Sequence, residues 1–295
     1  GVMTDMAREG RNMRKTTLAA GLLWGLAAVS AQAVGIRQFS PQGEVSQVGQ
    51  VVVQLDGAGV RLGDPKAAAP VALKCSDAEA AKGQGRWNSE KEWVFDFNQN
   101  LPAGVRCTAQ INPKFKTTAG TALTGAASYQ FQTGGPQVSS ISPDTYESVD
   151  EQQYFALRLT GAATTDSLQK RVWCTSEGVG ERIPVQLIEG KERDAVLKQQ
   201  HWDKDAAKNP QSYAVLACNR RLTSGSKMTL VYGKGVAMAN GLVSKDEQRY
   251  EYQVREPFSA DFSCERENAN SACLPIRPMR LSFNAPVPRK LMEAI

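Results

Sequence analysis

Short runs of alternating hydrophobic and polar residues, separated by turns rich in glycine, proline and asparagine, dominate the chain after its first 33 residues. Such alternation is typical of strands that bury one face. β-Branched and aromatic residues are frequent in these runs, as a half-buried pleated surface prefers. The single helix candidate is the charged segment Lys191–Lys208. We expect strands at 51–55, 93–97, 129–133, 154–159, 213–216, 228–232 and 250–254.

Two parts of the chain repeat each other, and this repeat predicts the architecture. Ser40-Pro41 and Ser142-Pro143 each precede a strand at nearly the same distance. Further on, each copy reads as a strand, an Asn-x-x-Leu-x-x-Gly turn and a second strand. The glycine suits the positive φ that a tight connection needs. The aligned pairs are Asn98 with Asn219, Leu101 with Leu222, and Gly104 with Gly225.

The repeat predicts an all-β protein made of tandem fibronectin- or Ig-like β-sandwiches. We place the first domain at 34–134 and the second at 135–255. A further strand at 279–283 follows Pro257. Residues 256–295 are therefore expected to begin a third, truncated sandwich, and we expect the chain to be the front of a longer protein.

Residues 1–33 are expected to contain upstream residues followed by an export signal. Arg14 and Lys15 precede an apolar run at 18–29, and an Ala-x-Ala pattern ends at Ala33. We place the native start at Met13 and signal cleavage after Ala33. The alternative is an uncleaved membrane anchor, for which the apolar run is short. No later segment is long and apolar enough to suggest a membrane span.

The chain has 6 cysteines. An even number in an exported chain favours disulfides. Free or zinc-binding thiols are the alternative, but Cys-x-x-Cys is absent and the chain has 1 histidine. The aligned copies do not place cysteines at matching positions, so we expect the two sandwiches to be stapled differently. With one pair per domain, the sequence predicts the disulfides Cys75–Cys107, Cys174–Cys218 and Cys264–Cys273.

Charge and motifs argue against an enzyme or a nucleic-acid-binding protein. The formal net charge is +5, and beyond residue 33 acidic and basic residues are close to balanced without a basic cluster. The single histidine, His201, has no evident nucleophile partner. Gly57-Ala58-Gly59 and Gly233-Lys234-Gly235 have the wrong spacing for nucleotide loops. We therefore predict no catalytic residue, cofactor site or metal site, with a cation on loop carboxylates as the alternative.

Four tryptophans raise the alternative of a sugar- or peptide-binding surface. Trp93 and Trp173 lie in strand patterns, so we expect them in a core. Trp87 and Trp202 lie in loop-like contexts and are the better binding candidates.

Several stretches together resemble the N-terminal region of bacterial alpha-2-macroglobulins of the periplasmic type. Their order and spacing extend the resemblance over about residues 35–290. The most distinctive stretch is Val254–Cys264 (VREPFSADFSC). The others are Phe39–Val45, Gly85–Trp87, Leu101–Gly104, Arg182–Val185, Tyr232–Val236 and Cys273–Pro275.

The resemblance implies macroglobulin-type domains that serve as a non-catalytic scaffold in an exported endopeptidase inhibitor. Proteases trapped by the full-length protein, and other cell-envelope proteins, are the implied partners, and the periplasm is the implied location. Many members of the family use a Cys-Gly-Glu-Gln thioester. No cysteine of this chain is followed by Gly-Glu-Gln, so no functional residue is transferred from the family.

Two other functions remain open. One is a tandem Ig-like adhesin or envelope binding module, and the other is the accessory domains of an enzyme. All three hypotheses expect neither nucleic acid as a partner nor a membrane span after the signal peptide.

Glu189–Gln211 is expected to be a long exposed loop, and its lysines would make it a substrate for trypsin-like proteases rather than an inhibitory segment.

Overall fold

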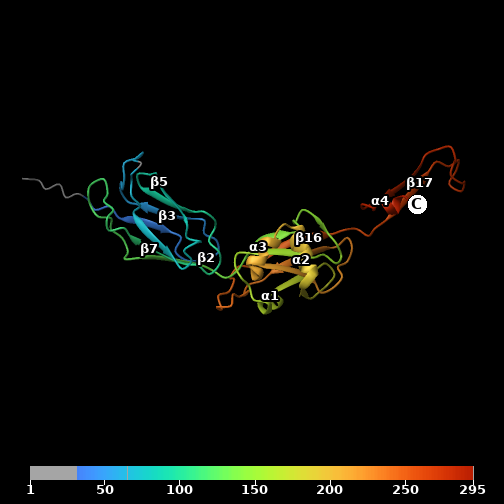
Figure 1. Ribbon diagram of the computed structural model, residues 1–295. Coiled ribbons are helices and arrows are strands. Elements are labelled where there is room, and N and C mark those ends of the chain that lie inside the picture. The colour runs from blue at the N-terminus through green and yellow to red at the C-terminus, as the bar shows by residue number, and fades with distance from the viewer. Residues whose placement is uncertain (1–31, 65, 295) are drawn as a thin grey trace, which may run out of the picture. The chain divides into compact units, whose positions relative to one another are not determined.

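The computed structural model describes residues 32–64 and 66–294 (Figure 1). Within these residues the chain forms eighteen strands, β1 to β18, and four short α-helices, α1 to α4. The protein is therefore all-β, as the alternation of hydrophobic and polar residues predicts. The expected export signal falls on residues 1–33, of which 1–31 lie outside the described part.

The first sandwich consists of two four-stranded sheets. All neighbouring strands in it are antiparallel except β2 and β8, which are parallel. One sheet has the order β1 (Ile36–Ser40), β3 (Gln50–Leu55), β6 (Glu92–Phe97) and β5 (Gly83–Ser89). The other has the order β2 (Gly43–Val45), β8 (Tyr129–Thr133), β7 (Arg106–Ile111) and β4 (Val71–Cys75).

The first core forms where the alternating residues of both sheets point inward. Val51, Val53 and Leu55 of β3 are buried, and the residues between them are half-buried. Phe131 of β8 is buried opposite them and belongs to the same cluster. The period of two residues therefore places the apolar face of each strand in one shared core.

The strands of the second sandwich form one continuous sheet, and this sheet folds over into two layers. β13 pairs with β12 through Ile183 and Pro184, and with β14 through Val185–Leu187. This strand therefore belongs to both layers. The order is β10 (Ser148–Val149), β16 (Gln248–Val254), β15 (Lys227–Tyr232), β12 (Val172–Ser176), β13 (Ile183–Leu187), β14 (Tyr213–Cys218), β11 (Phe155–Leu159) and β9 (Val138–Ser142).

The repeated Ser-Pro dipeptide marks the same change of sheet in both sandwiches. β1 ends at Ser40 and β2 begins just after it in the facing sheet. β9 ends at Ser142, and β10 then pairs in parallel with β16. Both Ser-Pro peptide bonds are cis.

The second half of the repeat is equally regular. The bounds of β6 and β14, and those of β7 and β15, are displaced by the same number of residues along the chain. In the turns between them, Leu101 and Leu222 are both buried. Gly104 and Gly225 have φ values of 76° and 74°. Separate hydrophobic cores lie on the two sides of residue 135, although the exact domain boundaries stay predictions.

The segment expected to be one helix and an exposed loop contains two helices. α2 (Gly190–Gln199) and α3 (Asp203–Lys208) are separated at His201, whose φ of 61° interrupts the helical backbone. Leu197 of α2 and Ala206 of α3 are buried against β11 and β14. The prediction of an open loop at Glu189–Gln211 is therefore wrong, because its few apolar residues suffice to seat both helices on the sheet.

The helix α1 (Thr165–Arg171) was not expected from the sequence. The Thr164 hydroxyl accepts a hydrogen bond from the Ser167 backbone N–H at 3.3 Å and caps its first turn. Leu168 anchors the helix in the second core. With only seven residues, α1 is too short for a clear helical pattern in the sequence.

A hairpin follows the second sandwich. It pairs β17 (Ala260–Cys264) with β18 (Met279–Phe283), and α4 (Arg289–Met292) comes next. Phe262 faces Leu281 in the register, so both lie on one face of the hairpin, and both are exposed. The third sandwich stays a prediction.

The described residues contain no helix that is long and apolar enough to cross a membrane.

Candidate functional site

All six predicted cysteines form the three predicted disulfides. Cys75–Cys107 joins the paired strands β4 and β7 within one sheet. Cys174–Cys218 joins β12 to β14, the two strands on either side of β13, and so closes the second sandwich where β13 passes from one layer to the other. Cys264–Cys273 closes a short loop after β17. The two sandwiches are thus stapled differently, and the disulfides agree with export into an oxidising compartment.

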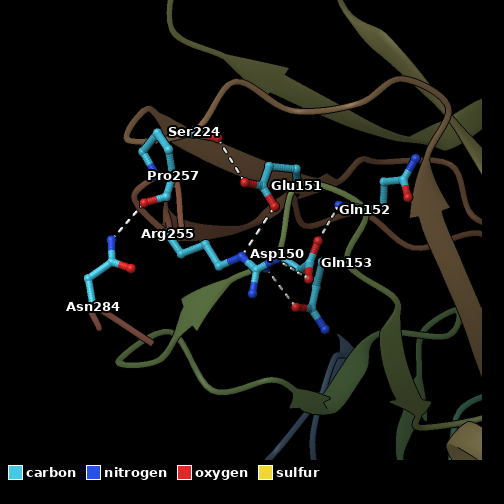
Figure 2. Close-up of polar contacts among 8 residues, drawn as sticks. All are labelled: Asp150, Glu151, Gln152, Gln153, Ser224, Arg255, Pro257 and Asn284. Carbon is cyan, nitrogen blue, oxygen red and sulfur yellow. Dashed lines mark hydrogen bonds and ion pairs between the residues drawn. The ribbon is translucent and has the colours of Figure 1, made fainter. Parts of the chain in front are cut away.

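A polar cluster lies where the chain leaves the second sandwich (Figure 2). We call it the exit cluster and define it by Asp150, Glu151, Ser224 and Arg255. Asp150 and Glu151 follow β10, Ser224 lies in the turn between β14 and β15, and Arg255 follows β16. Because β10 and β16 are parallel neighbours, their last residues meet at the same end of the sheet.

Glu151 is at the centre of the exit cluster and is 5% exposed. The Ser224 hydroxyl donates to Glu151 Oε1 at 2.8 Å, and Arg255 Nε donates to Glu151 Oε2 at 3.2 Å. The Ser224 hydroxyl, the backbone N–H of Glu151 and then Arg255 lower the pKa of this carboxyl from 4.5 to about 2. Glu151 therefore stays ionised and accepts hydrogen bonds at neutral pH.

Arg255 binds a second carboxylate at the same time. Its NH2 group lies 3.1 Å from Asp150 Oδ2. Asp150 is in turn fixed by its own loop, since its Oδ1 accepts the Gln152 backbone N–H at 3.0 Å, and its backbone N–H donates to Gln153 Oε1 at 3.0 Å. One guanidinium therefore holds two consecutive acidic residues in place.

Backbone hydrogen bonds close the exit cluster around these side chains. The Arg255 N–H donates to the Val149 carbonyl at 2.9 Å, and the Leu222 N–H donates to the Glu151 carbonyl at 2.9 Å. The Gly225 N–H donates to the Arg255 carbonyl at 3.0 Å. Three segments far apart in the sequence are thereby joined at the last residue of the second sandwich.

A smaller set of hydrogen bonds fixes the segment that follows. Asn284 Nδ2 donates to the Pro257 carbonyl at 2.6 Å (Figure 2). The Ser259 N–H donates to Asn284 Oδ1 at 2.8 Å. The amide side chain at the end of the hairpin therefore orders the chain just before β17.

The exit cluster is built for structure. Its buried carboxylate is satisfied by three donors and has a pKa too low to supply a proton near neutral pH. Among the described residues, no group of three or more His, Cys, Asp or Glu side chains is arranged to hold a metal ion. What the arrangement does is hold Arg255, the residue at which the chain leaves the sandwich, against the end of β10 and the turn between β14 and β15.

The positions of the four tryptophans agree only in part with the sequence prediction. Trp93 is buried in the first core, as expected. Trp173 is only half-buried, because its neighbours Val172 and Cys174 take the inward positions of β12. Its outer ring face carries the Arg182 guanidinium at 3.8 Å from the ring centroid. The prediction of Trp173 as a core residue is therefore wrong.

Of the two binding candidates, Trp87 lies in a strand and not in a loop, whereas Trp202 lies in the short connection between α2 and α3. Trp87 lies in β5, stacks on Phe115 with ring centroids 5.7 Å apart, and lines a cleft of the first sandwich. Trp202 precedes α3, packs on Tyr213 and lies under the Arg158 guanidinium. Of the two binding candidates, only Trp87 therefore lines this cleft.

Two of the other sequence candidates have structural roles. His201 is exposed and forms the break between α2 and α3. A Cβ atom on Gly233 would lie 2.4 Å from the Trp173 ring, so this glycine makes room for that ring.

Neither a protein-family model nor a curated protein sequence matches the chain. Among solved structures, an L,D-transpeptidase from Mycobacterium tuberculosis H37Rv is 16% identical, with a TM-score of 0.27 over 54% of this chain and 60% of that chain. An L,D-transpeptidase from Mycobacterium smegmatis is 14% identical, with a TM-score of 0.27 over 72% and 79%. The N-terminal part of the bacterial S-layer protein SbsC is 11% identical, with a TM-score of 0.25 over 77% and 45%.

This chain spans less than two thirds of the length of the first of these transpeptidases. TM-scores this low support no argument about fold or function, and the fold assignment rests on the strands, sheets and cores described above.

Proposed function

We propose that the chain is the non-catalytic N-terminal scaffold of an exported, alpha-2-macroglobulin-like protein that traps proteases. The observation that supports this most is the ordered repeat of two disulfide-stapled sandwiches whose second exit is fixed by Arg255 and Glu151. A cage around a protease needs rigid domains with defined exits. The sequence resemblance over about residues 35–290 supports the same function, with the periplasm as location and cleavage after Ala33.

In this function the domains position other parts of the full-length protein. Proteases are then partners of the whole protein, and other envelope proteins are partners of the outer surface. A buried ionised carboxylate between Ser224 and Arg255 serves this purpose, because it joins three segments without reacting.

The experiment compares two substrates of one protease. The native protein is isolated from the cell envelope with an antibody against residues 34–255 and incubated with trypsin. A trapping protein blocks cleavage of a large protein substrate and leaves cleavage of a small chromogenic substrate intact, since only the small substrate reaches an enclosed active site.

The alternative function, a tandem Ig-like adhesin or envelope binding module, predicts a different result. Trypsin would then cleave both substrates at unchanged rates. Equal inhibition of both substrates would contradict both functions, because it indicates a blocked active site rather than an enclosed protease.

A further inference from the structure

A cleft on one side of the first sandwich is lined by residues 60–64, 67 and 69, which lie between β3 and β4. It has a volume of about 610 Å³ and lies between β4 and β5, which are edge strands of the two facing sheets. This volume falls within the range of about 300–1,000 Å³ that ligand sites usually have. Leu73 lines one wall, Trp87 lines the other, and Trp93 and Phe95 form the floor.

Two glycines of β5 make room for the rings of this floor, of which Trp93 is buried and Phe95 is half-buried. Gly83 and Gly85 pair with Phe97 and Phe95 of β6. A Cβ atom on Gly85 would come within 2.4 Å of the Trp93 ring, and one on Gly83 within 2.8 Å of the Phe95 ring. Because both side chains are missing, the aromatic rings spread beneath β5, and Phe95 stays half-exposed.

The strand β5 beside the cleft is an edge strand of its sheet. β5 pairs with β6 on one side, and within residues 32–64 and 66–294 it pairs with no strand on the other. It is seven residues long and has no proline, which are features of an edge that accepts another strand. An extended chain added there would point alternate side chains toward the aromatic floor.

The mouth of the cleft carries a cationic group, Arg61, together with the carboxylate of Asp64. Arg86 Nε donates to Asp96 Oδ2 at 3.0 Å, so this pair is neutral. Asp64 Oδ1 accepts the Lys66 backbone N–H at 2.8 Å. Arg61 also lines the cleft, and the described part of the chain gives it no ion pair or side-chain hydrogen bond. Its guanidinium is thus available to a carboxylate.

We propose that this cleft binds an extended polypeptide that pairs with the free edge of β5. The polypeptide inserts one large apolar side chain among Trp87, Trp93 and Phe95, and it places an acidic side chain beside Arg61. The edge supplies backbone hydrogen bonds, the aromatic floor selects the side chain, and Arg61 selects the charge. This binding site does not depend on protease trapping.

The probe is an acetylated, amidated heptapeptide with a central phenylalanine, a glutamate at each end and threonine elsewhere. It is titrated into the full chain at low salt while tryptophan fluorescence is recorded. We expect a saturable change. Replacing the phenylalanine by serine, or N-methylating alternate residues, is expected to weaken binding by about tenfold or more, because each removes one of the two proposed contacts.

Two pairs of protein variants locate the site. Arg61→Glu is expected to weaken binding about fivefold, and Arg220→Glu, an exposed arginine of the second sandwich, to leave it unchanged. Trp87→Phe should reduce the fluorescence change, since Trp93 also contacts the inserted side chain, and Trp202→Phe should retain it in full. Thermal unfolding of each variant confirms that the fold is kept.

Three outcomes would overturn the proposal. The first is the absence of a saturable change up to about 1 mM peptide. The second is equal binding of the N-methylated peptide, which would mean that the edge of β5 is unused. The third is equal binding of N-acetylphenylalaninamide, which would make the cleft a site for small aromatic molecules.

Discussion

The Arg255 Nε donates to Glu151 Oε2 at 3.2 Å, although these residues are 104 positions apart in the sequence. The contact joins the beginning of the second sandwich to the residue at which the chain leaves it. The Ser224 hydroxyl adds a third segment to the same carboxylate. This relationship makes the second sandwich a closed unit with a fixed exit.

The low pKa of Glu151 predicts an acid-dependent loss of stability. The folded-state pKa is about 2 and the ordinary value is 4.5, so the ionised carboxylate stabilises the fold above about pH 4.5. This contribution is lost as the pH falls toward 2. The thermal midpoint of the wild type should therefore drop more steeply over this interval than that of Glu151→Gln.

The matched control is Glu181→Gln, which changes an exposed glutamate before β13. Its midpoint should follow the wild type at every pH. Parallel curves for Glu151→Gln and the wild type would contradict the assigned role of the carboxylate.

Removal of Cys174–Cys218 should destabilise the second sandwich. The disulfide closes a loop with a sequence separation of 44, for which chain entropy predicts about 4 kcal/mol. In the double variant Cys174→Ala and Cys218→Ala, amide hydrogen exchange should accelerate in β12 to β15. Unchanged exchange in β3, β6 and β7 of the first sandwich is the internal control. An equal acceleration in both sandwiches would contradict the expectation that each disulfide stabilises its own sandwich.

Gly225→Ala should cost about 1–2 kcal/mol in the free energy of unfolding. The φ of 74° is strained for any residue with a Cβ atom, and the new atom would also lie 2.9 Å from a Glu256 carboxylate oxygen. Chemical denaturation measures the loss. Gly180→Ala, at an open position without a positive φ, should be within about 0.5 kcal/mol of the wild type, and a similar loss in both would count against the backbone argument.

Limited trypsin digestion should spare the segment 191–208. Leu197 and Ala206 hold α2 and α3 on the sheet, so their lysine bonds are not in an extended conformation. The first cut should fall after Arg266, which lies in the exposed connection between β17 and β18, and it is seen after reduction because the Cys264–Cys273 disulfide spans it. Mass spectrometry of early fragments gives the order, and a first cut within 191–208 would contradict the helical packing.

Local sequence signals predicted much of the fold. The Asn-x-x-Leu-x-x-Gly turn identified the repeat because Gly104 and Gly225 need a positive φ and Leu101 and Leu222 need burial. Cysteine order gave the disulfides because each pair lies within one hydrophobic unit or hairpin.

Other features depend on contacts that no local pattern reveals. The sequence around Glu151 is acidic and polar, and its partner Ser224 is 73 residues away. The outward position of Trp173 depends on the register of β12, since a shift of one residue would have turned it inward. A helix was expected at 191–208, but its break at His201 and its packing on the sheet were not, because only a few apolar residues contact the sheet.

We predict that these sandwiches are scaffold and do not themselves inhibit a protease. The most direct test incubates the full chain with an equimolar amount of trypsin and follows a small chromogenic substrate. We expect an unchanged rate, because α2 and α3 pack on the sheet and present no extended loop to the active site of trypsin. Tight stoichiometric inhibition, with Glu189–Gln211 uncut, would contradict it and identify the chain as a small active-site inhibitor.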